Sequence, residues 1–190
     1  MAATYKVAVL AGDGIGPEIT QQALRVLRLI EQKRDVIFAC EEAEFGAAAY
    51  FSTGKAFPDA TKKACDEADA ILKGPIGLSH EESEKIPVEE RPERGALLPM
   101  RRRLNTYANF RPISLPKGMA RFSPLKPEIV GEGIDIMLIR ELIGGLYFGG
   151  KERGKTKEGL RYVKESLDYD EQQIRQILIV AFKESMKRKK

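Results

Sequence analysis

An arginine and a tyrosine seven positions apart, Arg140 and Tyr147, are the residues of this sequence best suited to chemistry. Arg140 follows a buried-looking apolar run, Ile136 to Ile139, and the pair Gly144 and Gly145 permits a tight turn before a second short strand begins at Tyr147. Charge at a strand end beside glycines is typical of sites in α/β proteins. The pattern therefore predicts a site, and an ordinary hairpin with a surface arginine is the alternative.

Three arginines could take part in such a site, because they come from three different expected elements. Arg101 falls on a helix, whereas Arg111 and Arg140 fall within or at the end of strands. The planar guanidinium makes two parallel hydrogen bonds to a carboxylate, so three convergent arginines would orient a dicarboxylate. Their convergence does not follow from the sequence.

A glycine-rich turn, Gly12 to Glu18, lies between an expected strand and an expected helix. Glycines at a helix N-terminus can cradle a phosphate. The dinucleotide fingerprint, however, ends in a glycine or alanine where this chain has Pro17. The motif itself therefore indicates a tight strand-to-helix turn, in which Asp13 could act as a cap.

Strands and helices alternate along the first part of the chain, which predicts an α/β layer with a mostly parallel sheet. The first helix carries an apolar stripe that includes Ile19, Val26 and Ile30. The expected strands are Tyr5 to Ala11, Val36 to Cys40 and Ala70 to Lys73, and the expected helices are Pro17 to Glu31, Phe45 to Ser52 and Pro58 to Ala68.

The second part begins with a proline-containing charged segment, Gly74 to Gly95, that reads as a long loop, either a binding segment or a solvated linker. The clearest element is the last helix, where Asp170 and Gln173 form the pattern of a capping box. The expected order is a helix over Ala96 to Asn105, a strand over Ala108 to Leu115, the hairpin over Asp135 to Gly149 and a helix over Glu171 to Lys190.

Composition excludes several classes of protein. The net charge of +4 is concentrated in Arg101 to Arg103 and Lys187 to Lys190, and the absence of an aromatic platform beside the terminal run argues against nucleic-acid binding. No apolar run approaches the roughly 20 residues of a membrane helix. Two cysteines cannot form a disulfide framework, and no residue cluster suggests a metal site. We expect a cytoplasmic protein.

Four motifs together resemble the 3-isopropylmalate dehydrogenases, members of the β-decarboxylating dehydrogenase superfamily. The resemblance runs along the whole chain, and its motifs follow one another in order. They are KVAVLAGDGIGPEI at Lys6 to Ile19, RPERGALLPMRRRLNTYANFRP at Arg91 to Pro112, SPLKPEI at Ser123 to Ile129 and RELIGGLYFG at Arg140 to Gly149.

The resemblance implies roles for individual residues. Arg101, Arg111 and Arg140 would hold the carboxylates and hydroxyl of the malate, and Tyr147 would help to protonate the enol after carbon dioxide leaves. Leu97 would meet the isopropyl group. The loop that borders the nicotinamide of NAD would supply Gly74, Ile76, Gly77 and Glu93. This loop departs from the family pattern, and Ile143 stands where threonine is typical.

The resemblance also implies that about half of the enzyme lies beyond this sequence, including the catalytic lysine, the aspartates that bind magnesium or manganese and most of the NAD site. We therefore expect two incomplete domains, residues 1–105 on the cofactor side and 106–190 on the substrate and dimer side. The chain would form a homodimer or pair with a complementing C-terminal chain, and alone it would be inactive.

Several functions stay open at this point. The substrate would be 3-isopropylmalate or another 2-hydroxy diacid such as homoisocitrate or tartrate. A non-catalytic remnant or a binding fragment that pairs with another chain is the alternative to a truncated or split dehydrogenase.

Overall fold

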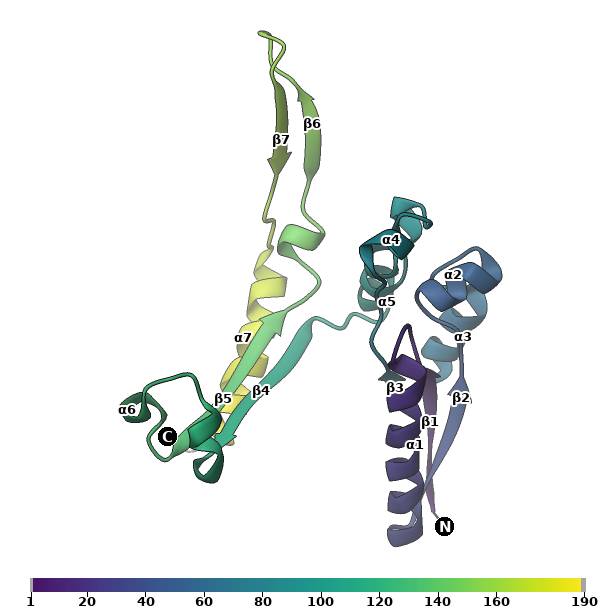
Figure 1. Cartoon of the computed structure of the whole chain (residues 1–190), viewed down its shortest axis with the longest axis vertical. Coiled ribbons are helices and arrows are strands. Elements are labelled where there is room, and N and C mark those ends of the chain that lie inside the picture. Colours follow the sequence, from purple (N-terminus) through teal and green to yellow (C-terminus); the bar gives the residue numbers. More distant parts are fainter. Residues whose placement is uncertain (1, 189–190) are drawn as a thin grey trace. The chain divides into compact units, whose positions relative to one another are not determined.

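The computed structural model describes residues 2–188, and these fall into two compact units that divide between Leu104 and Asn105. Figure 1 shows the elements of each unit. The two units are described separately.

A three-stranded parallel sheet forms the centre of the first unit. Its strands are β1 (Ala3–Leu10), β2 (Val36–Glu42) and β3 (Ala70–Lys73), in the order β2-β1-β3. Helix α1 (Gly16–Lys33) connects β1 to β2, and α2 (Ala47–Thr53) and α3 (Asp59–Glu67) connect β2 to β3. The predicted alternation and parallel pairing are confirmed, with β3 at the predicted bounds. Gly54 ends α2 in a left-handed conformation, φ +78°.

The apolar residues of β1 serve both faces of this sheet. Val7 and Val9 pack with Leu24 of α1 on one face. On the other face, Leu10 belongs to the main core cluster of the unit. The buried members of that cluster are Leu10, Phe45, Ala56, Phe57, Cys65, Ala96 and Met100. A strand buried on both faces reads as a continuous apolar run, as the second half of β1, Val7 to Leu10, does.

The expected apolar stripe of α1 packs only in part. The buried helix residues are Gly16, Thr20 and Leu24, and Leu27 of the same stripe packs against Val7, Val9 and Leu24. Ile19 and Val26, in contrast, are about half exposed, at 47% and 54%. Part of the apolar stripe is therefore left uncovered.

The segment after β3 is not the structureless loop that we expected. It contains α4 (His80–Ser83), a 3₁₀ turn (Val88–Glu90) and a π-helical turn (Pro92–Leu97) that leads directly into α5 (Leu98–Arg103). Ser79 and Glu82 form a capping box at the start of α4. Short-range polar pairs of this kind order a segment that lacks a long apolar period, which explains why the prediction was wrong.

The second unit is built on an antiparallel pair of strands, β4 (Ala108–Pro116) and β5 (Gly133–Glu141). A 3₁₀ turn (Lys117–Phe122) and α6 (Pro127–Val130) connect them. Helix α7 (Glu171–Met186) contacts β5 and starts with the predicted Asp170 and Gln173 capping box. The last two residues of the predicted terminal helix, Lys189 and Lys190, lie outside the described residues.

The predicted hairpin over Asp135 to Gly149 is wrong in its pairing. Strand β5 pairs with β4, and Tyr147 lies in a 3₁₀ turn (Gly145–Tyr147) rather than in a strand. β5 is also not fully buried, because Ile136 and Leu138 are each about half exposed. The turn is nevertheless tight, as the glycine pair predicts.

A second antiparallel pair, β6 (Lys151–Lys155) and β7 (Arg161–Glu165), forms a hairpin that extends beyond α7 in the second unit (Figure 1). Almost all of its residues are exposed. In the described part of the chain, no helix combines the length and the apolar character needed to cross a membrane.

Candidate active site

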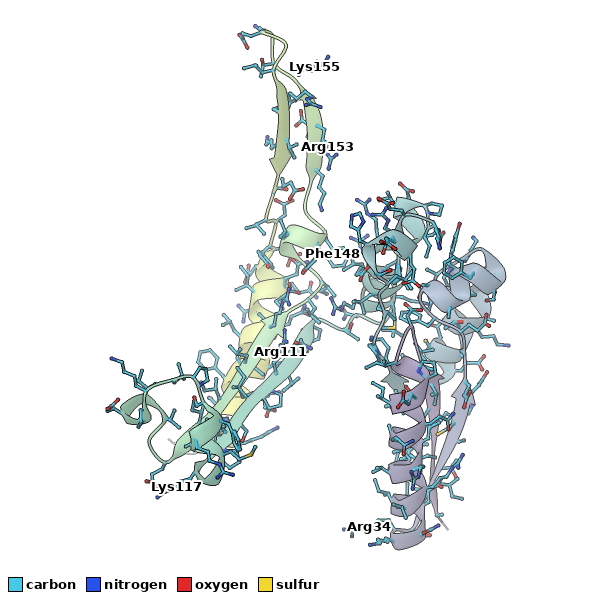
Figure 2. The ribbon with its side chains drawn as sticks, viewed as in Figure 1. Arg34, Arg111, Lys117, Phe148, Arg153 and Lys155 are labelled. Atoms are coloured by element: carbon cyan, nitrogen blue, oxygen red, sulfur yellow. The ribbon has the colours of Figure 1, made fainter. Side chains whose placement is uncertain are left out.

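Two of the predicted arginines lie on the same face of the β4–β5 pair. Asn109 is opposite Arg140, and Arg111 is opposite Leu138. Because side chains alternate between the faces of a strand, Arg111 and Arg140 are diagonal neighbours on one face. Figure 2 labels Arg111 on β4.

A hollow of about 730 Å³ in the second unit brings these arginines together with the predicted tyrosine. Its wall combines two cationic groups with apolar side chains, which suits an anion that carries an apolar group. The lining residues are Arg111, Pro112, Ile113, Leu138, Ile139, Arg140, Glu141, Gly144, Leu146, Tyr147, Leu167 and Tyr169.

Arg140 and Tyr147 are in direct contact. Nη2 of Arg140 donates a hydrogen bond of 3.3 Å to the hydroxyl oxygen of Tyr147, and the guanidinium carbon lies 5.7 Å from the centre of the tyrosine ring. The contact fixes the position of the Tyr147 hydroxyl beside a group that also lines the hollow.

The turn between Arg140 and Tyr147 is held by the carboxylate of Glu141 and by the ring of Tyr169. The carboxylate of Glu141 accepts hydrogen bonds from the backbone N–H groups of Ile143 and Gly144, at 2.8 and 3.0 Å. The ring of Tyr169 packs so closely that a Cβ at Gly144 would lie 2.9 Å from it. Tyr169 was not among the predicted site residues. Its position directly before the Asp170 capping box is one where an apolar side chain often packs against the start of the helix.

Ile143 contributes to the turn through its backbone. The group that bonds to Glu141 is the backbone N–H, so isoleucine at this position makes the same contact as the threonine that the resemblance led us to expect. Ile143 is therefore compatible with the conformation of the turn.

The remaining two substrate residues of the prediction, Leu97 and Arg101, belong to the first unit. Leu97 is partly buried against the main core cluster. Arg101 lies near Lys73, the last residue of β3. The pKa of Lys73 is lowered, mainly because the side chain is buried and secondly because of the positive charge of Arg101, while the carboxylate of Asp13 acts to raise it. The convergence of all three arginines stays a prediction.

The predicted cofactor loop begins inside the first unit. The N–H of Gly74 donates to the carbonyl of Leu10 at 2.8 Å, and Ile76 packs against the main core cluster. The N–H of Gly77 donates to the carboxylate of Asp13 at 3.0 Å, and a Cβ at Gly77 would lie 3.4 Å from the exposed carboxylate of Glu93. Gly74, Ile76 and Gly77, three of the four predicted cofactor residues, thus make contacts within the protein.

Part of the glycine-rich turn after β1 packs against this loop. A Cβ at Gly12 would lie 2.0 Å from the carbonyl oxygen of Pro75, and the N–H of Asp13 donates to the same oxygen at 2.9 Å. Gly14, in contrast, has no atom within 4 Å of a Cβ built there. The close approach at Gly12 therefore serves the packing of the turn on the loop.

Asp13 is buried, and it does not cap α1 as the sequence suggested. Helix α1 starts without a side-chain cap, whereas the Asp13 carboxylate accepts hydrogen bonds from the N–H of Ala48 in α2, at 2.9 Å, and from Gly77. This carboxylate joins α2 and the cofactor loop to the turn after β1. The reason is tertiary, because both donors lie far from Asp13 in the sequence.

A divalent metal does not fit the described residues. Within residues 2–188, no group of three or more histidine, cysteine, aspartate or glutamate side chains is placed to hold an ion. Magnesium and manganese require several oxygen ligands. No step of chemistry is therefore assigned through a metal held by these residues.

Comparison with known proteins shows the family of the chain. A sequence model described as isocitrate/isopropylmalate dehydrogenase matches residues 6–190. The chain belongs to the isocitrate/isopropylmalate dehydrogenase family. It is 44% identical to a 3-isopropylmalate dehydrogenase of Geobacter sulfurreducens over 100% of its own length and 52% of the relative's, and 41% identical to one of Campylobacter jejuni over 98% and 50%.

Solved structures of this family share the fold. Isocitrate dehydrogenase from Methylococcus capsulatus superposes with a TM-score of 0.74 at 25% identity, covering 96% of this chain and 48% of that one. The chain spans about half the length of the curated relatives it matches. The fold is a partial isopropylmalate-dehydrogenase-like α/β fold.

Proposed function

We propose that this chain supplies the substrate-holding half of the active site of an NAD-dependent dehydrogenase that oxidises and decarboxylates 3-isopropylmalate in leucine biosynthesis. The observation that carries the proposal is the hollow of the second unit, where Arg111, Arg140 and Tyr147 line one space and Arg140 contacts Tyr147 directly. The names of the relatives support the substrate.

In this proposal the two arginines of the hollow bind the carboxylates of the diacid. Each guanidinium presents parallel donors to one carboxylate. This geometry orients the substrate, and the positive charge of the arginine balances the negative charge of the carboxylate. Ile113, Leu138 and Leu146 form an apolar wall of the hollow beside the arginines, which we propose contacts the isopropyl side of the substrate. Arg101 and Leu97 of the first unit are proposed to complete the contacts.

Tyr147 gives a proton to the carbon of the enolate that remains after carbon dioxide leaves. The hydroxyl O–H bond of the tyrosine breaks, the carbon–hydrogen bond forms as the enolate becomes a ketone, and the resulting phenolate oxygen lies beside Arg140. When bound, NAD would accept the hydride in the preceding oxidation. We propose that Gly77 and Glu93 border its nicotinamide, and that a second half of the enzyme holds its remaining parts and the magnesium or manganese ion.

A complementing polypeptide is proposed because the described residues leave apolar surface uncovered. Helix α7 exposes Ile174, Leu178 and Phe182, at 48%, 47% and 68%, in addition to the uncovered part of the stripe on α1. Large exposed apolar surfaces mark sites of association or aggregation. The polypeptide that covers them would carry the other half of the dehydrogenase.

Self-association is proposed through the β6–β7 hairpin, which lies within residues 150–167. Its strands pair with each other, and Val163 is 62% exposed. A two-stranded ladder of this kind offers free edges to a second copy. Homodimer formation and complementation by another chain are compatible.

Co-expression tests the proposal. The chain is produced with the part of the Geobacter sulfurreducens relative that follows the matched half, and NADH formation is followed by absorbance with 3-isopropylmalate, NAD and magnesium. We expect turnover from the pair and none from the chain alone. Homoisocitrate and tartrate, assayed in parallel, identify the diacid.

Two outcomes would contradict the proposal. NADH formation by the chain alone would show that the missing half is not required. A stable complex without turnover on any of the three diacids would favour a non-catalytic binding fragment.

A further inference from the structure

We infer that Glu141 is a positioning residue, whose carboxylate holds the Tyr147 hydroxyl against Arg140. The functional meaning of this inference rests on the proposed role of Tyr147. Its structural content stands on the contacts of the turn alone.

The carboxylate uses both of its oxygens on the turn that separates Arg140 from Tyr147. Oε1 accepts from the N–H of Ile143 at 2.8 Å, and Oε2 accepts from the N–H of Gly144 at 3.0 Å. Hydrogen bonds to an ionised acceptor are stronger than neutral ones. Glu141 therefore fixes the first half of the turn in one conformation.

The start of the turn is anchored independently of Glu141. Leu142 is buried, and its N–H donates to the carbonyl of Tyr107 at 3.0 Å. Gly145 follows Gly144 directly and begins the 3₁₀ turn that contains Tyr147. Its N–H donates to the carbonyl of Asp168 at 3.0 Å, and a Cβ there would lie 2.2 Å from the hydroxyl oxygen of Tyr169. This close fit requires the chain to leave Gly144 in the direction that the Glu141 carboxylate sets.

Only a carboxylate can satisfy both donors. A glutamine of the same length offers one acceptor oxygen and an NH₂ group, and that NH₂ group would face a backbone N–H. One of the two N–H groups would lose its partner, and the turn would open at Ile143 or Gly144. Because Tyr147 follows the turn by three residues, opening it moves the phenol away from Arg140.

A fluorine-labelled chain tests this inference without any enzymatic assay. All tyrosines of the full chain are replaced by 3-fluorotyrosine, and the ¹⁹F resonance of Tyr147 is assigned by its loss in Tyr147→Phe. Arg140→Gln gives the resonance position of Tyr147 without its cationic neighbour. Glu141→Gln is the test variant, and Glu128→Gln, which removes an exposed carboxylate of α6, is the matched control.

We expect Glu141→Gln to move the Tyr147 resonance toward its position in Arg140→Gln, while the resonances of Tyr5 and Tyr50 in the first unit stay unchanged. Glu128→Gln should leave all of them in place. In hydrogen-exchange measurements, the amides of Ile143 and Gly144 should exchange about tenfold faster in Glu141→Gln than in the unsubstituted chain.

An unchanged Tyr147 resonance in Glu141→Gln would overturn the inference. Simultaneous loss of the folded resonances of Tyr162 and Tyr169 would also overturn it, because Glu141 would then determine the fold of the whole unit. The fluorine experiment does not measure activity. Its result can therefore be interpreted even if the co-expressed pair shows no turnover, so the dehydrogenase proposal and the positioning role of Glu141 are tested independently.

Discussion

The hydroxyl of Tyr147 lies 3.3 Å from Nη2 of Arg140, and a turn that begins at Glu141 brings the two side chains together. The contact lies within the second unit. It gives the proposed proton donor a cationic neighbour within the same unit.

Loss of the Tyr147 hydroxyl should affect proton transfer more than substrate binding. In the complemented enzyme, we expect Tyr147→Phe to lower kcat by about 10²- to 10⁴-fold, the usual contribution of a positioned acid, with a much smaller change in KM. Steady-state kinetics with 3-isopropylmalate check this. Tyr5→Phe, at an exposed position of β1, should leave both constants unchanged, and an equal loss in both variants would contradict the assignment.

Gly145 should be intolerant of a side chain for two reasons. Its φ of +63° disfavours residues with a Cβ, and that atom would lie 2.2 Å from the Tyr169 hydroxyl oxygen. We expect Gly145→Ala to lower the free energy of unfolding by about 3 kcal/mol, because strain and overpacking add. Urea titration followed by circular dichroism measures the change.

Gly159 provides the control for this substitution. Its φ is +86°, but no atom lies within 4 Å of a Cβ built there. Gly159→Ala should therefore cost about 1 kcal/mol from backbone strain alone. Equal effects at the two positions would show that the contact with Tyr169 is not tight.

The buried carboxylate of Asp13 should be important for the stability of the first unit. Asp13→Ala leaves the N–H groups of Ala48 and Gly77 without their acceptor, which we expect to lower the free energy of unfolding by about 3 kcal/mol. Thermal and urea unfolding check the value. Asp35→Ala, at an exposed turn, should have little effect, and comparable losses would disprove the role of the Asp13 contacts.

An ion pair between α3 and α5 should make the first unit sensitive to acid. Nε and Nη2 of Arg103 donate to the two oxygens of Asp66, at 2.8 and 2.5 Å, and this contact lowers the pKa of Asp66. A carboxyl group with a lowered pKa in the folded state stabilises the fold above its unfolded pKa, about 3.9, and loses this contribution as the pH falls through the folded pKa.

We therefore expect Arg103→Gln to lower Tm modestly at pH 7, with the difference from the unsubstituted chain closing as the pH falls below about 4. Thermal unfolding between pH 7 and strong acid measures this. Arg34→Gln, which removes the same charge from an exposed position after α1, is the control. A difference that stays constant across this pH range would rule out the ion pair as its cause.

Elements whose signals are local could be predicted from the sequence. The bounds of β3 and the capping box at Asp170 and Gln173 both follow from neighbouring residues. The four family motifs likewise lie in short contiguous stretches. Arg111, Arg140 and Tyr147 were identified as candidates in this way, before their positions in space were known.

Which of these elements meet depends on the tertiary fold. Strand β5 pairs with β4, the Asp13 carboxylate bonds to residues 35 and 64 positions away, and α1 buries only part of its apolar stripe. These contacts depend on chain segments far apart in sequence. Periodicity and turn residues report the conformation of a segment but not its partner, so the hollow with Arg111, Arg140 and Tyr147 emerged only when the strands were paired.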